Sequence, residues 1–257
     1  MRRRDFCRGS LAGGLFATYP YLAGCGKEAP VAPAVAPAPA KAEAGIAAIS
    51  LDGTQIELEK AAVNELGKAL SGRLILAGHP EYDSVRKVWN GMHDKRPALI
   101  ARCANAEDAR HAVTFARERD LLSAVRGGGP SWPGNSVCDG GIMMDLAEMY
   151  GVEVDTAAQR AHVQGGALLG HLDAASLPHG LVTTAGVVSH TGVGGFTLGG
   201  GFGRLNRKHG LAIDNLVSAD IVTADGQLRT VSAENETELF WAIRGGGGNF
   251  GVATRFE

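Results

Sequence analysis

The sequence predicts an α+β fold, in which a small parallel-sheet unit is followed by an antiparallel sheet that carries helices. Between residues 97 and 126 a strand, a helix and a second strand follow one another, which is the order of a parallel unit. After Gly141 the apolar runs are short and alternate with turn residues, as in antiparallel sheets. Glycine makes up 37 of the 257 residues, about twice its usual share of ~7%, and it gathers in clusters between apolar runs.

The composition supports a sizeable core and excludes some classes of partner. A chain of 257 residues suits one large domain or two small ones, at roughly 100–200 residues per domain, and 45% of the residues are hydrophobic. Lysine and arginine number 25 against 27 aspartates and glutamates, so we expect no nucleic-acid partner, which would require a basic excess. The eight histidines form no i,i+4 pair in a helical run, and we expect no metal site.

Residues 1–25 predict an export signal with a lipid anchor. The run Arg3-Arg4-Asp5-Phe6-Cys7-Arg8 resembles a twin-arginine signal, and the stretch 9–24 is too short and polar to span a bilayer. It ends in Leu22-Ala23-Gly24-Cys25, which resembles a lipobox with Cys25 as the lipidated residue. We therefore expect a periplasmic or cell-surface protein that meets the membrane only through its lipid. The alternative is a chance basic start followed by a buried helix.

A tether follows the predicted signal. Residues 27–44 consist mostly of alanine and proline, a composition that forms an extended spacer and builds no core. We predict a linker over residues 26–50 and a folded domain over residues 73–257.

The elements of the predicted parallel unit follow from periodicity and caps. Apolar residues at helical spacing predict a helix from Leu58 to Ala69, and residues 74–76 read as a short extended segment. Pro97 precedes a strand at 98–101. Asn105 is the N-cap of a helix to about residue 119, with acidic residues in its first turn. A strand at 122–125 closes the unit.

The second half reads as short strands with one helix. Four strands are predicted, at residues 142–144, 152–154, 161–163 and 221–223. The sequence Ala224-Asp225-Gly226 predicts a turn. A helix at 236–243 carries Leu239, Phe240 and Ile243 on one face, and residues 252–256 resemble a strand.

Two cysteines remain in the predicted mature domain beyond the lipidated one. Cys103 and Cys138 are either a disulfide, which an oxidising compartment permits, or two buried thiols. The sequence contains no CxxC pair, so a zinc ribbon and a redox dithiol are excluded.

The glycine clusters are the candidate binding elements. The run Arg126–Ser131 follows an apolar strand, and successive glycine N–H groups form a concave nest that suits a pyrophosphate. A tight loop without a ligand is the alternative for this run taken alone. The cluster 192–203 lets a flat ring lie directly on the main chain, because its positions carry small side chains or none.

A literal G-x-G-x-x-G occurs at residues 246–251, but it is not a Rossmann fingerprint. The fingerprint needs a strand before it and a helix after it, whereas here a predicted helix precedes and a strand follows. The sequence also contains no Walker A, G-x-S-x-G or H-E-x-x-H motif.

Taken together and in order, these motifs resemble the FAD-binding PCMH-type domain of the vanillyl-alcohol-oxidase superfamily, and within it the berberine-bridge-enzyme-like FAD-linked oxidoreductases. The resemblance runs from about Arg73 to the last residue. The matching stretches are residues 98–102, 126–131, 134–141, 189–195, 214–216 and 240–251.

The resemblance implies that FAD lies between two α+β subdomains. It implies a pyrophosphate site on one loop, a flavin-ring site on the second cluster, and main-chain contacts from the third. The implied cofactor-binding residues are Arg126, Gly127, Gly128, Gly129, Pro130 and Ser131 on the loop, Gly186, Ser189, His190, Gly192, Val193, Gly194 and Gly195 at the ring, and Asn249, Gly251 and Val252 opposite.

The chain departs from the family at both covalent tethers. The family has a histidine, which bonds the flavin 8α-methyl, where this sequence has Pro130, and a cysteine where it has Val188. Proline also lacks the N–H that a phosphate nest uses. We therefore predict non-covalent FAD, with His190 as the alternative tether.

The resemblance also implies an oxidase whose substrate domain follows the FAD-binding domain, and we expect the chain to end before it. No catalytic residue is assigned. We expect an exported FAD-linked oxidoreductase that passes a hydride from an alcohol-type substrate to flavin, with oxygen as acceptor and a small-molecule substrate bound if a substrate domain is supplied. The alternative is a truncated or degenerate lipoprotein that keeps the fold and binds FAD weakly or not at all. An uncovered domain face would expose an apolar patch.

Overall fold

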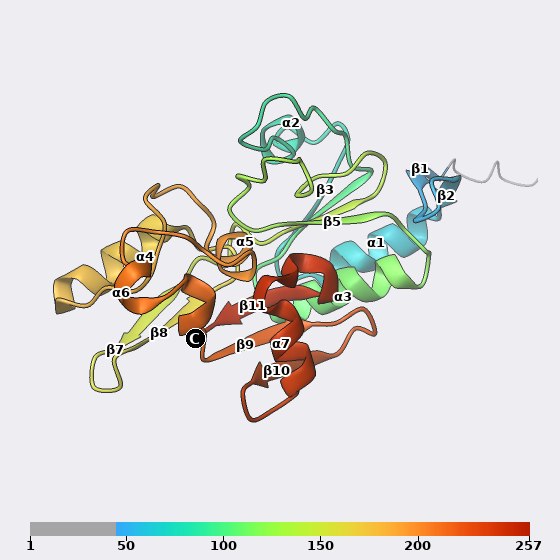
Figure 1. Ribbon diagram of the computed structural model, residues 1–257. Helices are drawn as coiled ribbons and strands as arrows, with labels where there is room; N and C mark the ends of the chain where they lie inside the picture. The colour runs from blue at the N-terminus through green and yellow to red at the C-terminus, as the bar shows by residue number, and fades with distance from the viewer. Residues whose placement is uncertain (1–44) are drawn as a thin grey trace, which may run out of the picture. The chain divides into compact units, whose positions relative to one another are not determined.

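The computed structural model describes residues 45–257, which form two sheets and a hairpin (Figure 1). The first sheet has four strands in the order β3-β4-β6-β5, and we call it and its helices the four-stranded unit. Strands β4, β6 and β5 run parallel, and β3 is antiparallel to β4. The strands are β3 (Arg73–Leu76), β4 (Leu99–Arg102), β5 (Ser123–Arg126) and β6 (Ile142–Asp145).

Strand β6 lies in a different sheet from the one predicted. The sequence predicts residues 142–144 as part of the antiparallel half, but β6 lies between β4 and β5 in the parallel sheet, and all four of its residues are buried. A continuous apolar run without alternation is typical of a strand covered on both faces. The order of the elements in the sequence hides this position. Helix α3 connects β4 to β5, a long loop follows β5, and β6 then pairs between these two strands.

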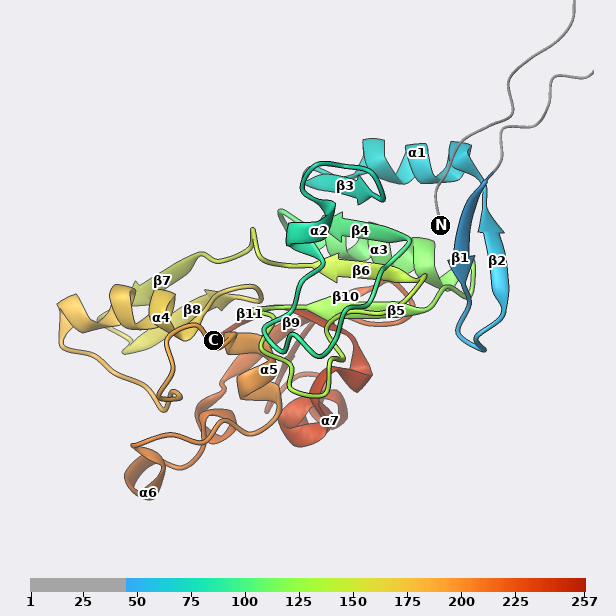
Figure 2. The same cartoon turned by 90° about the horizontal axis from the view of Figure 1, so that it is seen from above.

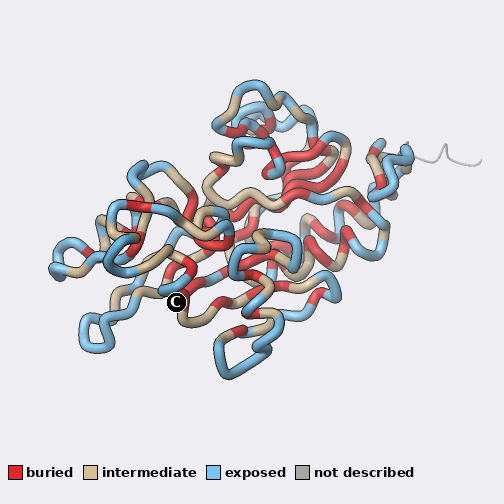
Figure 3. The backbone as a smooth tube through the Cα atoms, viewed as in Figure 1, coloured by how far each residue is buried: buried red, intermediate tan, exposed pale blue. Residues whose placement is uncertain are grey.

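Helix α3 (Ala106–Arg117) joins the two sheets into one core. It begins where the sequence predicts, because the side-chain oxygen of Asn105 accepts a hydrogen bond from the N–H of Asp108 at 3.0 Å. Its buried face packs with α1 (Lys60–Ala69) and the four-stranded sheet, in a cluster that also contains Val222 and Val252 of the second sheet. In Figure 3 the buried residues concentrate in the four-stranded sheet and along one side of α3.

The second sheet is antiparallel throughout, with the order β10-β9-β11-β8-β7. We call it and its helices the five-stranded unit. Its turn at residues 224–226 is as predicted, with Gly226 at φ 79°. Its strands are β7 (Val152–Asp155), β8 (Arg160–Gln164), β9 (Ser218–Val222), β10 (Leu228–Ser232) and β11 (Val252–Phe256).

The remaining helices surround the sheets (Figures 1 and 2). Helix α7 changes direction at Arg244 and Gly245, so its regular part ends where the sequence predicts. The helices are α2 (Tyr82–Val85), α4 (Leu169–Ser176), α5 (Val193–Leu198), α6 (Asn206–His209) and α7 (Thr237–Gly246), with 3₁₀ turns at Leu177–His179, Ala212–Asn215 and Gly247–Phe250. No helix within residues 45–257 is long and apolar enough to cross a membrane.

The first strand of a hairpin occupies the end of the predicted linker, which corrects that prediction. Strands β1 (Ile46–Ile49) and β2 (Gln55–Leu58) pair in antiparallel register, and the Ile49 N–H donates to the carbonyl oxygen of Gly140 at 2.8 Å. Buried Ala48 and Leu58 belong to the core cluster around α3. The folded part therefore begins before residue 73. The predicted signal, with Cys25, lies outside the described residues.

Cys103 and Cys138 are both free and buried. The disulfide alternative is wrong for this structure, and the two buried thiols are what it shows. Burial raises the pKa of both thiols, that of Cys138 to about 11.

Candidate functional site

Three glycine-rich segments that lie far apart in the sequence line one cavity. They are the loop after β5, the residues around α5, and the turn between α7 and β11. The cavity has a volume of about 750 Å³, within the roughly 300–1,000 Å³ of small-molecule and cofactor sites. It lies between the four-stranded and the five-stranded units.

The two units meet at the cavity through glycine. A methyl group on Gly128 would overlap the main chain of Gly192, and one on Gly192 would lie 2.5 Å from the nitrogen of Gly128. Real Cβ atoms do not approach this closely, so both positions require glycine. The absence of side chains here is explained by chain packing alone.

Two other lining glycines have no such explanation. A methyl group on Gly195 or on Gly248 would meet no atom within 4 Å, and neither residue has a positive φ. Packing and backbone strain therefore leave both positions free to carry a side chain. A flat ligand that lies against the main chain does account for them, because any side chain there would occupy its place.

Polar groups of the lining lack partners. No described residue accepts a hydrogen bond from the N–H groups of Gly127, Gly128 or Gly129. Three unpaired N–H groups in succession suit an anion such as a diphosphate. The hydroxyl of Ser136 is buried and also has no partner among the described residues. Since buried polar groups are normally hydrogen-bonded, these donors fit a polar ligand.

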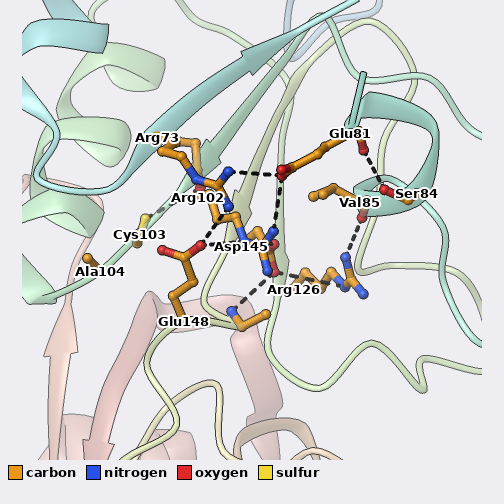
Figure 4. A network of polar contacts seen from close by, with 12 residues as sticks. Arg73, Glu81, Ser84, Val85, Arg102, Cys103, Ala104, Arg126, Asp145 and Glu148 are labelled. Atoms are coloured by element: carbon orange, nitrogen blue, oxygen red, sulfur yellow. Dashed lines mark hydrogen bonds and ion pairs between the residues drawn. The ribbon is translucent and has the colours of Figure 1, made fainter. Parts of the chain in front are cut away.

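Arg126 was predicted to bind the cofactor, but it is not among the lining residues. Its Nε lies 3.9 Å from Oδ1 of the fully buried Asp145, and its Nη1 donates to the carbonyl oxygen of Val85 (Figure 4). A second guanidinium, that of Arg102, lies 3.5 Å from Oδ2 of the same carboxylate. All three residues end parallel strands, which brings them to one edge of the sheet. The Arg126 side chain therefore contacts Val85 and Asp145 behind the loop and does not face the cavity.

Burial governs the acidity of Asp145. Removal from water raises the pKa of this carboxyl group, and the positive charges of Arg126 and Arg102 oppose the rise without cancelling it.

The cavity brings together most of the predicted site residues. Those in its lining are Gly127, Gly128, Gly129, Pro130, Ser131, Gly192, Gly194, Gly195, Asn249 and Gly251. Arg126, Gly186, Ser189, His190, Val193 and Val252 are not in the lining. Val193 and Val252 are buried in the hydrophobic core instead. Ser189 and His190 are exposed and directly precede the lining residue Thr191.

The sequence did not single out several lining residues. Gly165 follows β8, and a methyl group on it would overlap the carbonyl oxygen of Ala253, but a single glycine after a strand carries no signal of its own. Ser136 and Asn135 lie within residues 134–141, a stretch that resembles the family but in itself indicates no ligand contact. Phe196 and Thr191 stand inside or beside the second glycine cluster.

A second cavity, of about 440 Å³, lies in the five-stranded unit among β8, α4 and the end of β11. Its walls are mostly aliphatic and include Leu169, Leu172 and Val182. It lacks the glycine loop after β5, so we place the candidate site in the larger cavity. Within residues 45–257, no group of three or more histidine, cysteine, aspartate or glutamate side chains is placed to hold a metal ion.

Comparison with known proteins agrees with this geometry. Residues 97–232 match a family described as an FAD binding domain. The chain is 40% identical over 189 residues to (R)-6-hydroxynicotine oxidase of Paenarthrobacter nicotinovorans, a match that covers 74% of this chain and 41% of the relative. It is 35% identical to xylooligosaccharide oxidase of Thermothelomyces thermophilus, with 77% and 41% covered.

Solved structures give the same result. The crystal structure of 6-hydroxy-D-nicotine oxidase from Arthrobacter nicotinovorans superposes with a TM-score of 0.71 at 40% identity, covering 73% of this chain and 41% of that one. Glucooligosaccharide oxidase of Acremonium strictum, which carries a 6-S-cysteinyl, 8α-N1-histidyl FAD, gives 0.69 at 33% identity, with 76% and 42% covered.

The chain spans about two fifths of the length of the relatives that it matches. Within that part, the fold of this chain agrees with that of the solved relatives, at TM-scores of 0.71 and 0.69. The chain belongs to the FAD-binding PCMH-type family, as the FAD-binding domain of berberine-bridge-enzyme-like FAD-linked oxidoreductases.

Proposed function

We propose that this chain holds FAD non-covalently in the glycine-lined cavity, as the cofactor-binding part of an exported oxidase. The proposal depends mainly on Gly195 and Gly248. Within residues 45–257, no atom outside the adjoining chain lies within 4 Å of where their Cβ atoms would be, so the space beside them is free for a ligand. The chemistry of Pro130 and Val188 supports non-covalent attachment, since neither side chain has a nucleophile to bond the flavin.

Different lining residues bind different parts of the cofactor. The N–H groups of Gly127, Gly128 and Gly129 hold the diphosphate, while Pro130 contributes no N–H to it. The Ser136 hydroxyl donates to a polar atom of the cofactor. When bound, FAD supplies a hydride acceptor, and the protein orients it.

The proposed reaction is oxidation of an alcohol-type small molecule, with oxygen as the final acceptor. Relatives named as oxidases of 6-hydroxynicotine and of xylooligosaccharides support this class of reaction. Their remaining length, beyond the two fifths matched here, is the expected source of the substrate domain and of the catalytic base. We assign no catalytic residue among residues 45–257.

A second candidate is a non-catalytic lipoprotein that keeps the fold but binds FAD weakly or not at all. Pro130 favours it, because this residue removes both a tether and an N–H donor from the loop.

An absorption spectrum of the purified protein, taken before and after acid precipitation, separates these alternatives. We expect flavin bands that pass into the supernatant. Flavin in the pellet would contradict non-covalent attachment, and His190 would then be the first residue to test. A protein that stays colourless after incubation with FAD would support the lipoprotein alternative.

We further propose export by the twin-arginine route and a lipid on Cys25, based on residues 1–25. In cell fractionation, Cys25→Ala should move the exported protein from the membrane to the soluble fraction. Replacing Arg3 and Arg4 together by lysine should block export. A Cys25→Ala protein that remains in the membrane would contradict the anchor.

A further inference from the structure

Three aromatic side chains from distant parts of the chain lie together beside the cavity. The ring centroids of Trp89 and Trp132 are 6.1 Å apart, and those of Trp89 and His190 are 6.2 Å apart with planes inclined by 25°. These separations are typical of aromatic pairs. We call Trp132, Trp89 and His190 the aromatic bridge. Two of its members come from loops of the four-stranded unit, and His190 precedes α5 in the five-stranded unit, so the bridge joins the units.

The segments that carry the bridge adjoin the cavity lining, although none of its three side chains is among the lining residues. The main-chain N–H of Trp89 donates to the carbonyl oxygen of Gly129 at 3.2 Å. Trp132 follows the lining residue Ser131, and His190 precedes the lining residue Thr191. In Figure 2 the loop after α2 and the loop after β5 run toward α5 together, and the side chain of Asn90 donates to the carbonyl oxygen of Trp132 at 2.8 Å, which links these two loops.

The bridge also lies next to both positions where relatives with covalent flavin carry their tethers. By resemblance, Pro130 stands at the histidine position and Val188 at the cysteine position. Trp132 is two residues from Pro130, and His190 is two residues from Val188. This end of the cavity is therefore where the flavin ring is expected, and where a chain without covalent bonds needs another means of holding it.

The exposure of the tryptophans indicates that they do little for the fold. Trp89 is 59% exposed and Trp132 71% exposed. Large aromatic surfaces that stay in water beside a cavity suggest a ligand partner, since indole faces stack well on flat heteroaromatic rings.

We propose that the aromatic bridge holds the flavin end of FAD, in place of the covalent bonds of the relatives. Its rings stack on the flavin, and their contacts with one another keep the two units together beside that end of the cavity. This inference rests on the proposed function, namely that FAD binds in the glycine-lined cavity. The bridge residues are positioning and binding residues, and no chemical step is assigned to them.

The test compares FAD with ADP, which lacks the flavin, in fluorescence titrations of the full chain. We expect Trp89→Ala to raise the Kd for FAD by about 10- to 100-fold, because this substitution removes both ring pairs. The Kd for ADP should change less than about twofold, since ADP does not reach the bridge. Trp89→Phe keeps an aromatic ring and should restore most of the affinity for FAD. Trp241→Ala is the matched control, because Trp241 is 75% exposed on α7 and lies outside the bridge.

Two results would overturn the inference. One is a Trp89→Ala protein that binds FAD as tightly as the unchanged chain. The other is an equal loss of FAD and ADP binding, which would mean a distorted cavity and not a lost flavin contact. If Trp89→Ala does not fold, His190→Ala takes its place. It removes only the Trp89–His190 pair, so we expect a smaller rise in the Kd for FAD, again with less than about a twofold change for ADP. Failure of the unchanged chain to bind FAD would contradict the proposed function itself, and this is seen before any variant is made.

Discussion

Gly128 and Gly192 touch through their main chains, although 64 positions separate them in the sequence. A methyl group on Gly192 would lie 2.5 Å from the nitrogen of Gly128, and one on Gly128 would overlap the Cα of Gly192. This contact presses the loop after β5 against the residue before α5. It is the reason that two of the three glycine segments border one cavity.

Gly128→Ala should therefore separate these segments. We expect the free energy of unfolding to fall by about 1–3 kcal/mol, as for other overpacked positions, and FAD to bind more weakly. Urea denaturation measures the first effect. Gly91→Ala is the control, because a methyl group there meets nothing within 4 Å and the residue has no positive φ. An unfolding midpoint for Gly128→Ala equal to that of the control would contradict the close contact.

Asp145 gives a prediction for pH. Burial raises the pKa of its carboxyl group above the ordinary value of 3.8, so the folded protein holds this proton more tightly than the unfolded chain does. The contribution of Asp145 to stability is then fully present below pH 3.8 and is lost as the pH rises through the folded-state pKa.

Asp145→Asn removes this titration and keeps the shape of the side chain. We expect the unfolding free energy of the unchanged chain, minus the unfolding free energy of the Asp145→Asn variant, to decrease as the pH rises from 4 toward 7. Urea denaturation across this range measures it. A difference that increases with pH would mean that Arg102 and Arg126 outweigh burial and lower the pKa of Asp145.

The two thiols should be unreactive while the protein is folded. Cys103 and Cys138 are buried, and burial raises the pKa of both, which leaves little thiolate to attack a reagent. We expect iodoacetamide at pH 8 to label neither residue in the folded protein and both after unfolding in urea without reductant. Peptide mass mapping distinguishes the sites. A peptide pair linked through these two cysteines would contradict the structure.

Local signals in the sequence predicted many elements of the fold, but not the helices α2, α4, α5 and α6 or the strand β10. Asn105 with acids in the next turn marked the start of α3, and Ala224-Asp225-Gly226 marked the turn between β9 and β10. The hairpin β1–β2 was missed because its first strand directly follows an alanine- and proline-rich stretch, whose composition predicts a linker. Its stability comes from packing against the core, which no local pattern reports.

The site was predictable to the level of segments, and less so for individual side chains. The three glycine clusters do line one cavity. Arg126 was expected to face the ligand, but the buried carboxylate of Asp145 draws its guanidinium away, and this pairing depends on β5 and β6 being neighbours. Likewise, nothing in the sequence distinguishes Gly195, which faces open space, from Gly192, which packs against Gly128.

The central claim is that FAD occupies the glycine-lined cavity, and titration of FAD into Gly195→Ala and Gly195→Leu tests it most directly. Replacing a helical glycine by alanine should add up to about 1 kcal/mol of stability, while the new side chain fills the space left for the cofactor. Gly67→Ala in α1 is the matched control, since its methyl group makes only an ordinary contact with Leu74 at 3.5 Å. We predict unchanged binding for the control, about tenfold weaker binding for Gly195→Ala, and still weaker binding for Gly195→Leu. FAD affinity equal to that of the unchanged chain in both Gly195 variants would contradict the claim.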